Sequence, residues 1–248
     1  MKARLFTIPA SHPGWTVRLM LERKGIPYTR IDLVKIVSMP VVRALGFPGS
    51  TVPALILDGK RIQGSRAIAH ELDALVPEPP LFPADPAERK RVEKAETWGD
   101  EVLQGVARRL AWNLLAKDSG SVRSYLEGSR LGVPHAVAAR TAPPIAKLAA
   151  RFDRADDAHA IADLAALPEL IDRVDGYIAD GVIGGDEPNA ADFQIAPSVA
   201  LLMTLDDLRP HISERPAGAL ATRLVPDFPG RTPPAFPSHW LAPLGGVT

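Results

Sequence analysis

The sequence predicts two domains, an α/β domain first and an all-helical domain after it. Three observations support this fold class. Residues 3–75 alternate short apolar runs with helix-like segments, in the order strand, helix, strand, helix, strand, strand, helix. A stiff, proline-rich stretch follows at residues 76–84. From Asp85 onward, apolar residues recur at helical spacing.

In the first domain we expect strands at residues 3–8, 28–33, 54–57 and 60–62. A helix is expected at residues 15–24, where Gly25 stops it and Pro27 prevents its continuation. Residues 34–45 form at most a weak helix interrupted by Pro40. The last helix begins at Ser65, and its predicted core-facing stripe is Ile68, Leu72 and Leu75.

Two positions in residues 47–75 suggest a ligand site. Pro53 stands where a strand begins, and the bond before it is predicted to be cis. A cis proline exposes the backbone N–H and C=O of Val52, with which an extended peptide can pair. Ser65 offers its hydroxyl and free helix N–H groups to a carboxylate. The structural alternatives are that Pro53 is a turn proline without a ligand and that Ser65 is only a helix cap.

The turn at residues 10–14 carries a third candidate. Ser11 lies between the first strand and the first helix, where helix N–H groups carry a positive partial charge. A hydroxyl there can donate to a bound thiolate and so lower the pKa of the thiol. The alternative is a serine that only caps the turn. His12 is either a second donor or an exposed loop residue.

Composition excludes several classes of function. Lys plus Arg and Asp plus Glu both number 29, so a net charge of zero gives no reason to expect nucleic acid or an anionic membrane as partner. The chain has no cysteine, which excludes disulfides, thiolate metal sites and cysteine nucleophiles. The six histidines lack ligand spacing, so we expect no metal site. No membrane span or signal peptide is apparent, and a cytoplasmic location is expected.

The second half reads as helices. Asp85 caps a long helix that reaches about Lys117 and is broken by polar residues 118–121. More helix is expected over residues 124–156, interrupted around residues 132–134 and 143–144, and over residues 167–180. Asn189 and Asp192 form a capping box that opens a further helix. From residue 215 the prolines return, and Phe236 and Trp240 are expected to hold this tail on the body.

Five sequence pieces in this order resemble cytosolic glutathione transferases: residues 15–19, 24–28, 48–55, 65–68 and 189–193. The similarity is close over residues 3–76 and loose over residues 85–205. It implies a thioredoxin-like thiol-binding domain at residues 1–76, a linker at 77–84, a helical-bundle domain at 85–214 and a proline-rich tail at 215–248. The resemblance also implies a homodimer.

The resemblance further implies roles for the candidate residues. Ser11, as in serine-type members, would stabilise the thiolate of a thiol cosubstrate, glutathione or a related thiol, and His12 is the alternative. Val52 and Pro53 would hold its cysteinyl part. The γ-glutamyl group would lie at the segment Gln63, Gly64 and Ser65. No cofactor is expected to be bound permanently.

This sequence departs from the family pattern at three positions. Phe47 replaces a common Asn, Thr51 replaces a common Lys or Gln, and Gly64 stands where an acidic residue or Gln is usual. A different thiol, or none, therefore stays open. The second substrate, a small electrophile, would lie between the domains, and the candidates to line its site are Trp98, Leu103, Arg108, Arg109 and Trp112.

Two other functions are known for folds of this kind. The departures from the family pattern favour a non-catalytic member that binds an apolar ligand or a protein partner in the cleft. A thiol–disulfide oxidoreductase on the same fold is excluded by the lack of cysteine, unless the substrate supplies the thiol.

Overall fold

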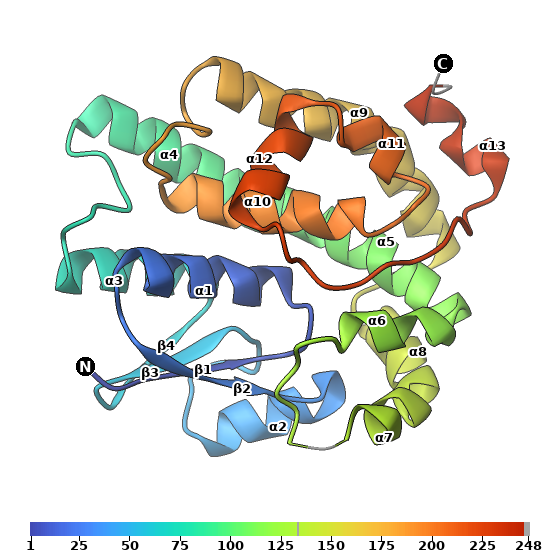
Figure 1. The fold of residues 1–248 in the computed structure, drawn as a ribbon, viewed down its shortest axis with the longest axis horizontal. Coiled ribbons are helices and arrows are strands. Elements are labelled where there is room, and N and C mark those ends of the chain that lie inside the picture. The colour runs from blue at the N-terminus through green and yellow to red at the C-terminus, as the bar shows by residue number, and fades with distance from the viewer. Residues whose placement is uncertain (133, 246–248) are drawn as a thin grey trace.

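The computed structural model describes residues 1–132 and 134–245, and Figure 1 shows its two-part architecture. The N-terminal part is built on a four-stranded sheet with the order β2-β1-β3-β4. β1 is parallel to β2 and antiparallel to β3, which is antiparallel to β4. The strands are β1 (Ala3–Thr7), β2 (Tyr28–Asp32), β3 (Ala54–Leu57) and β4 (Lys60–Gln63). The predicted α/β fold class of this part is confirmed.

Three helices cover the sheet: α1 (His12–Arg23), α2 (Lys35–Ala44) and α3 (Ser65–Leu75). α1 and α3 lie on the face turned to the helical part, and α2 covers the opposite face (Figure 1). Beneath α2 the small core consists of Phe6, Val42, Phe47, Ala54 and Ile56. The other face of the sheet shares one continuous core with the helices of the second part.

The structure corrects three expectations in the first part. α2 is not interrupted at Pro40, because packing of Ser38 and Val42 holds the helix on both sides of the lost hydrogen bond. α1 begins at His12 rather than near residue 15, since Ser11 already serves as its cap. Leu75 ends α3 with 49% of its surface exposed, so the buried stripe stops at Leu72.

The second part is all-helical, as predicted, and surrounds one central helix. A long helix consists of α4 (Pro86–Trp98), the π-helical turn η1 (Gly99–Leu103) and α5 (Gln104–Lys117). The other elements are η2 (Ser119–Ser121), α6 (Val122–Tyr125), α7 (His135–Arg140), α8 (Ala142–Phe152), α9 (Asp157–Ala179), α10 (Ala190–Met203), α11 (Arg209–Ile212), α12 (Pro216–Leu224), α13 (Ser238–Leu241) and η3 (Ala242–Leu244). α9 begins ahead of the predicted residue 167, because Asp156 caps it through the His159 N–H.

α10 forms the centre of the helical part. Its capping box is confirmed: the Asn189 side chain accepts from the Ala191 and Asp192 N–H groups, and the Asp192 carboxylate accepts from the Asn189 N–H. The helix is buried along nearly its whole length and packs on α1, α4, α5 and α12. Through its contact with α1, it fixes the helical part against the α/β part.

The C-terminal segment returns across the body. After α12, which packs on α10, the chain runs extended along the helical part to α13 (Figure 1). Phe228 contacts Trp15 of α1 with ring centroids 5.8 Å apart. Phe236 is buried in the main core, and Trp240 packs against the same core, with the ring centroids of the two residues 6.2 Å apart. This confirms that these two residues hold the tail on the body.

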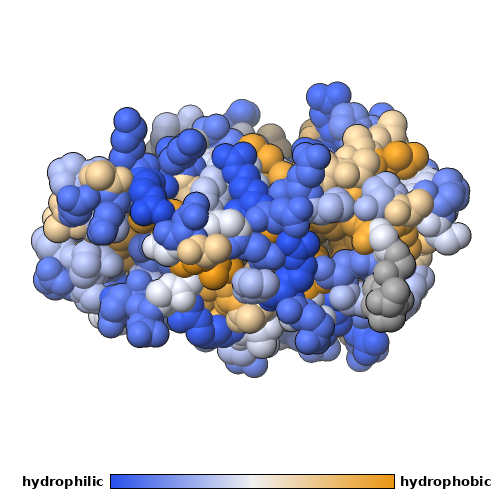
Figure 2. Space-filling model, turned by 90° about the horizontal axis from the view of Figure 1, so that it is seen from above, coloured by the Kyte–Doolittle hydropathy of each residue, from blue (hydrophilic) through white to orange (hydrophobic). Residues whose placement is uncertain are grey.

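The outer surface of the helical part is mostly hydrophilic, with apolar patches between the charged side chains (Figure 2). Within residues 1–132 and 134–245, no helix combines the length and apolar character needed to cross a membrane.

Candidate functional site

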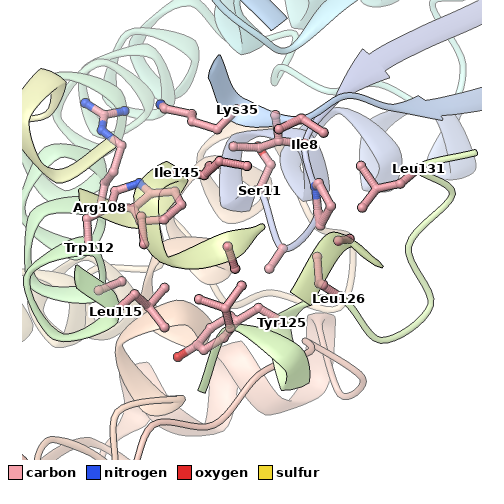
Figure 3. Close-up of a pocket in the computed structure, with 18 of the residues that line it drawn as sticks. Ile8, Ser11, Lys35, Arg108, Trp112, Leu115, Tyr125, Leu126, Leu131 and Ile145 are labelled. Carbon is pink, nitrogen blue, oxygen red and sulfur yellow. The ribbon is translucent and has the colours of Figure 1, made fainter. Parts of the chain in front are cut away.

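A cavity of about 320 Å³ lies between the two parts of the chain. One wall comes from the loop between β1 and α1 and from the start of α2. The other walls come from α5, α6, α7 and α8 (Figure 3). Most of the lining is apolar, with Ile8, Val34, Val52, Ala111, Trp112, Leu115, Val122, Leu126, Leu131, Ile145 and Leu201 among its members.

Ser11 lies in this cavity wall at the N-terminus of α1. Its Oγ accepts a hydrogen bond from the Gly14 N–H at 3.0 Å. Among the described residues, nothing accepts the proton of the Ser11 hydroxyl, which leaves it free to donate. The side chain is therefore both a helix cap and an available donor beside the positive end of a helix.

His12 also lines the cavity, but it is not the exposed loop residue that was one alternative. It is only 4% exposed, and its Nε2 has no hydrogen-bond partner in the described part of the chain. Burial, followed by the positive charges of Arg108 and Lys35, holds the pKa of His12 well below its usual value. A hydrogen bond to the Gln104 backbone opposes this shift. The ring is therefore neutral at physiological pH.

The predicted cis bond is present between Val52 and Pro53. Val52 lines the cavity, and no described backbone group bonds to its N–H or C=O. The Pro53 carbonyl accepts from the Gly64 N–H at 3.0 Å, which joins the start of β3 to the start of α3. Ser11 and Val52 thus meet at one cavity, and Gly64 adjoins it through Pro53.

The segment after β4 lies outside the cavity lining. Both ends of the Gln63 amide bond to the preceding loop: Oε1 accepts from the Gly49 N–H, and Nε2 donates to the Thr51 carbonyl, each at 2.6 Å. Gly64 has φ 88°, a conformation that favours glycine. Ser65 begins α3, is buried, and its hydroxyl has no partner among residues the structure describes.

Of the five residues expected to line a second-substrate site, Arg108 and Trp112 do so. The other three face elsewhere. Leu103 is buried in the core, and Arg109 forms a two-pronged pair with Asp163 at 2.6 and 2.7 Å. Trp98 lies against Tyr177 on another face of the long helix. The π-helical turn at η1 changes the helical phase between residues 98 and 108, which sequence spacing does not reveal.

Sequence reasoning missed Lys35 and the wall formed by α6, α7 and α8. Lys35 begins α2, and its Nζ lies 3.1 Å from Asp153 Oδ2. Arg108 Nε lies 3.1 Å from Asp153 Oδ1. The same carboxylate therefore links the α/β part to the helical part at the edge of the cavity.

Tyr125 is the only tyrosine in the described cavity lining, but its hydroxyl is not available there. The hydroxyl lies 2.8 Å from Thr204 Oγ1 and 2.9 Å from Thr232 Oγ1, and burial raises its pKa. Figure 3 shows the oxygen directed away from Ser11. The ring therefore contributes an apolar surface to the cavity.

Within the described ranges, no three His, Asp or Glu side chains come together in a way that could hold a metal ion.

The comparisons with known proteins agree with this geometry. Residues 5–80 match the family model described as glutathione S-transferase, N-terminal domain. A probable maleylacetoacetate isomerase from Caenorhabditis elegans is 31% identical over 90 residues, which are 36% of this chain and 42% of that protein. The chain thus matches less than half the length of this curated relative.

Several solved structures resemble nearly the whole chain. A glutathione S-transferase from Rhodospirillum rubrum has 19% identity and a TM-score of 0.62, with 97% of this chain and 99% of that one covered. A beta-etherase from Sphingobium sp. strain SYK-6 has 17% identity and a TM-score of 0.65, with 91% and 95% covered. A glutathione S-transferase from Methylobacterium radiotolerans, solved with glutathione sulfonate, has 20% identity and a TM-score of 0.52, with 92% of each chain covered.

The chain therefore has the two-part fold of glutathione S-transferases. Residues 5–80 match the model of the N-terminal domain of that superfamily. The resemblance drawn from the sequence is confirmed by the family model for residues 5–80 and, for the chain as a whole, at the level of the fold.

Proposed function

We propose that this protein transfers a thiol cosubstrate, glutathione or a close relative, onto a small electrophile bound in the cavity. One observation carries the proposal: a serine hydroxyl with a free proton stands at a helix N-terminus beside a largely apolar cavity. Two similar solved structures contain glutathione or its sulfonate, which supports glutathione as the thiol.

The chemistry follows from these groups. The Ser11 hydroxyl donates to the thiolate sulfur, and the N-terminus of α1 adds a favourable field. Both effects lower the pKa of the thiol and raise the fraction of nucleophile at neutral pH. The free N–H and C=O of Val52 pair with the backbone of the thiol peptide. Ser65, with the N–H groups of α3, holds a carboxylate of that peptide.

His12 is not suited to take up the thiol proton, because burial and the positive charges of Arg108 and Lys35 hold its pKa well below the usual value. Its Nε2 has no hydrogen-bond partner among the described residues, so the neutral ring leaves this nitrogen available to a bound ligand. The thiolate then attacks the electrophilic carbon, a carbon–sulfur bond forms, and the leaving group departs with its bonding electrons. The proton lost by the thiol passes to the leaving group or to water.

The test compares the wild type with Ser11→Ala. Binding of glutathione is measured by calorimetry, and turnover with a chloronitroaromatic electrophile is measured by absorbance. We expect the wild type to bind and to turn over, and the variant to lose about 100-fold or more in kcat, as when one oxyanion donor is removed. If the wild type neither binds glutathione nor turns over, this thiol is wrong. If the variant is equally active, the assigned hydroxyl is wrong.

A second candidate is a non-catalytic protein that uses the cavity to bind an apolar ligand or a partner. It is favoured by the missing side chain at Gly64 and by the Gln63 amide, whose hydrogen-bonding groups are already used by the 49–51 loop. Tight binding of apolar compounds without any glutathione-dependent turnover would support this candidate over the transferase.

A further inference from the structure

The charged groups in the lining of the cavity all have one sign. Lys35 and Arg108 contribute an ammonium and a guanidinium, whereas no Asp or Glu belongs to the described lining. Figure 3 shows the ends of these two side chains next to each other at one side of the cavity. His12, the third titratable base there, is neutral, so it adds no further positive charge.

One carboxylate outside the lining partly balances these two cations. Asp153, which is mostly buried, lies 3.1 Å from each of them. The group of three therefore keeps one net positive charge. Arg108 Nε is buried and makes no hydrogen bond within the described residues, because its contact with Asp153 is an ion pair with poor hydrogen-bond geometry. One net positive charge is left for an anion.

The position of the cations fixes how a ligand would lie. The Lys35 and Arg108 side chains are 26% and 35% exposed and line the cavity, so a ligand can reach both cations. The rest of the lining is mostly apolar and includes Trp112, Leu115 and Ile145. A molecule with an anionic head and an apolar body matches both the two cations and the apolar lining. Its body leaves water, while its head keeps charged partners.

We propose that the cavity selects compounds that combine an apolar, preferably aromatic, body with a carboxylate or a similar anionic group. Lys35 and Arg108 hold the anion, and the body lies against Trp112 and Leu115. The binding of such a ligand does not depend on the function proposed above. Only its role as the electrophile to be attacked rests on that function.

The same anionic chemistry has a second source, because the thiol cosubstrate also carries carboxylates. If the two cations serve glutathione, then a filled thiol site should remove the preference for anionic ligands. S-methylglutathione distinguishes the sources, because it can fill the thiol site but cannot react as a nucleophile.

The experiment measures the affinities of 2-naphthoate and 2-naphthamide, which differ mainly in charge, for the whole protein by calorimetry. The variants are Lys35→Met and Arg108→Met, each of which leaves Asp153 with one cation. Lys147→Met is the matched control, since Lys147 lies on α8 beside the lining residues Ile145 and Ala146 but is exposed and outside the cavity. Circular dichroism checks that each variant is folded.

We expect the wild type and Lys147→Met to prefer the carboxylate by about tenfold, with or without saturating S-methylglutathione. Each cavity variant should lose most of this preference while it keeps its affinity for the amide. Equal binding of the two probes by the wild type would overturn the proposal. A preference that S-methylglutathione abolishes would assign the cations to the thiol instead. Absent turnover with intact carboxylate preference would reject the transferase function and leave this inference standing.

Discussion

The Ser11 hydroxyl lies 3.0 Å from the Gly14 nitrogen, and this single contact gives the side chain two roles. As an acceptor, it satisfies one of the free N–H groups at the start of α1. As a hydroxyl, it still has a proton to donate toward the cavity. Removal of the oxygen should therefore affect both the stability of the fold and the chemistry, and the two effects can be separated.

For Ser11→Ala we expect a loss of about 1 kcal/mol in the free energy of unfolding, together with the loss of activity described above. Asp85→Ala is the matched control, because Asp85 caps α4 through the N–H groups of Ala87 and Glu88 far from the cavity. Urea unfolding should show similar losses for both variants, while only Ser11→Ala should lose turnover. Equal loss of turnover in both would mean that the effect comes from stability alone.

Gln63 should act on thiol binding through the loop before Val52. Gln63→Ala removes both bonds to residues 49 and 51, so we expect a stability loss of about 1–2 kcal/mol and about tenfold weaker binding of S-methylglutathione. Gln63→Glu keeps the acceptor for Gly49 but loses the donor to Thr51, and it should show a smaller effect of the same kind. Arg61→Met, which loses a bond from the same strand to Leu45, should leave thiol binding unchanged.

Replacement of Lys24 should reduce stability more than replacement of most other charged residues in the chain. Its buried ammonium donates to Asp73 at 2.8 Å and to the carbonyls of Val76 and Pro79 at 2.6 and 2.7 Å. Lys24→Met leaves these oxygens without their cation, and we expect a loss of about 3–5 kcal/mol in urea unfolding. The exposed pair of Lys60 and Glu71 gives the comparison: Lys60→Met should cost less than about 1 kcal/mol.

Glu96 predicts a pH dependence of stability. Burial raises its pKa from 4.5 to about 8, against an opposing effect of Arg66, and neither oxygen has a hydrogen-bond partner among the described residues. The folded protein keeps this proton up to about pH 8, whereas the unfolded chain loses it above 4.5. The contribution of Glu96 to stability is therefore greatest below pH 4.5 and falls as the pH rises toward 8.

Glu96→Gln should remove the loss of stability that Glu96 causes as the pH rises. The variant should match the wild type near pH 5 and exceed it by several kcal/mol near pH 8, as measured by urea unfolding at both values. Glu101→Gln is the control, because Glu101 also pairs with Arg66 but is mostly exposed. A gain that does not grow with pH would show that Glu96 is ionised in the folded protein.

The parts of this molecule that the sequence predicted are those set by local chemistry. A serine before a helix, a proline before a strand and the Asn189–Asp192 box each define their own backbone surroundings, and all three lie where expected. The alternation of strands and helices likewise identified the α/β part, because short apolar runs and turn residues suffice to mark strand ends.

The parts that could not be predicted depend on packing between distant segments. Nothing in the sequence near Glu96 distinguishes it from its exposed neighbours, because its burial comes from α3 and from the core around α10. The pairing of Lys35 with Asp153 joins two helices more than a hundred residues apart. The cavity wall of α6 and α8 likewise exists only after the second part has folded against the first.

Tyr125 connects the cavity to the end of the chain, because its hydroxyl contacts Thr204 at the end of α10 and Thr232 in the C-terminal segment. One wall of the cavity is thus held by a C-terminal segment whose Thr232 is not among the described lining residues. Substitutions around Thr232 should therefore alter ligand preference while they leave Ser11 and its chemistry in place. For protein engineering, this segment offers a way to retune selectivity without rebuilding the active site.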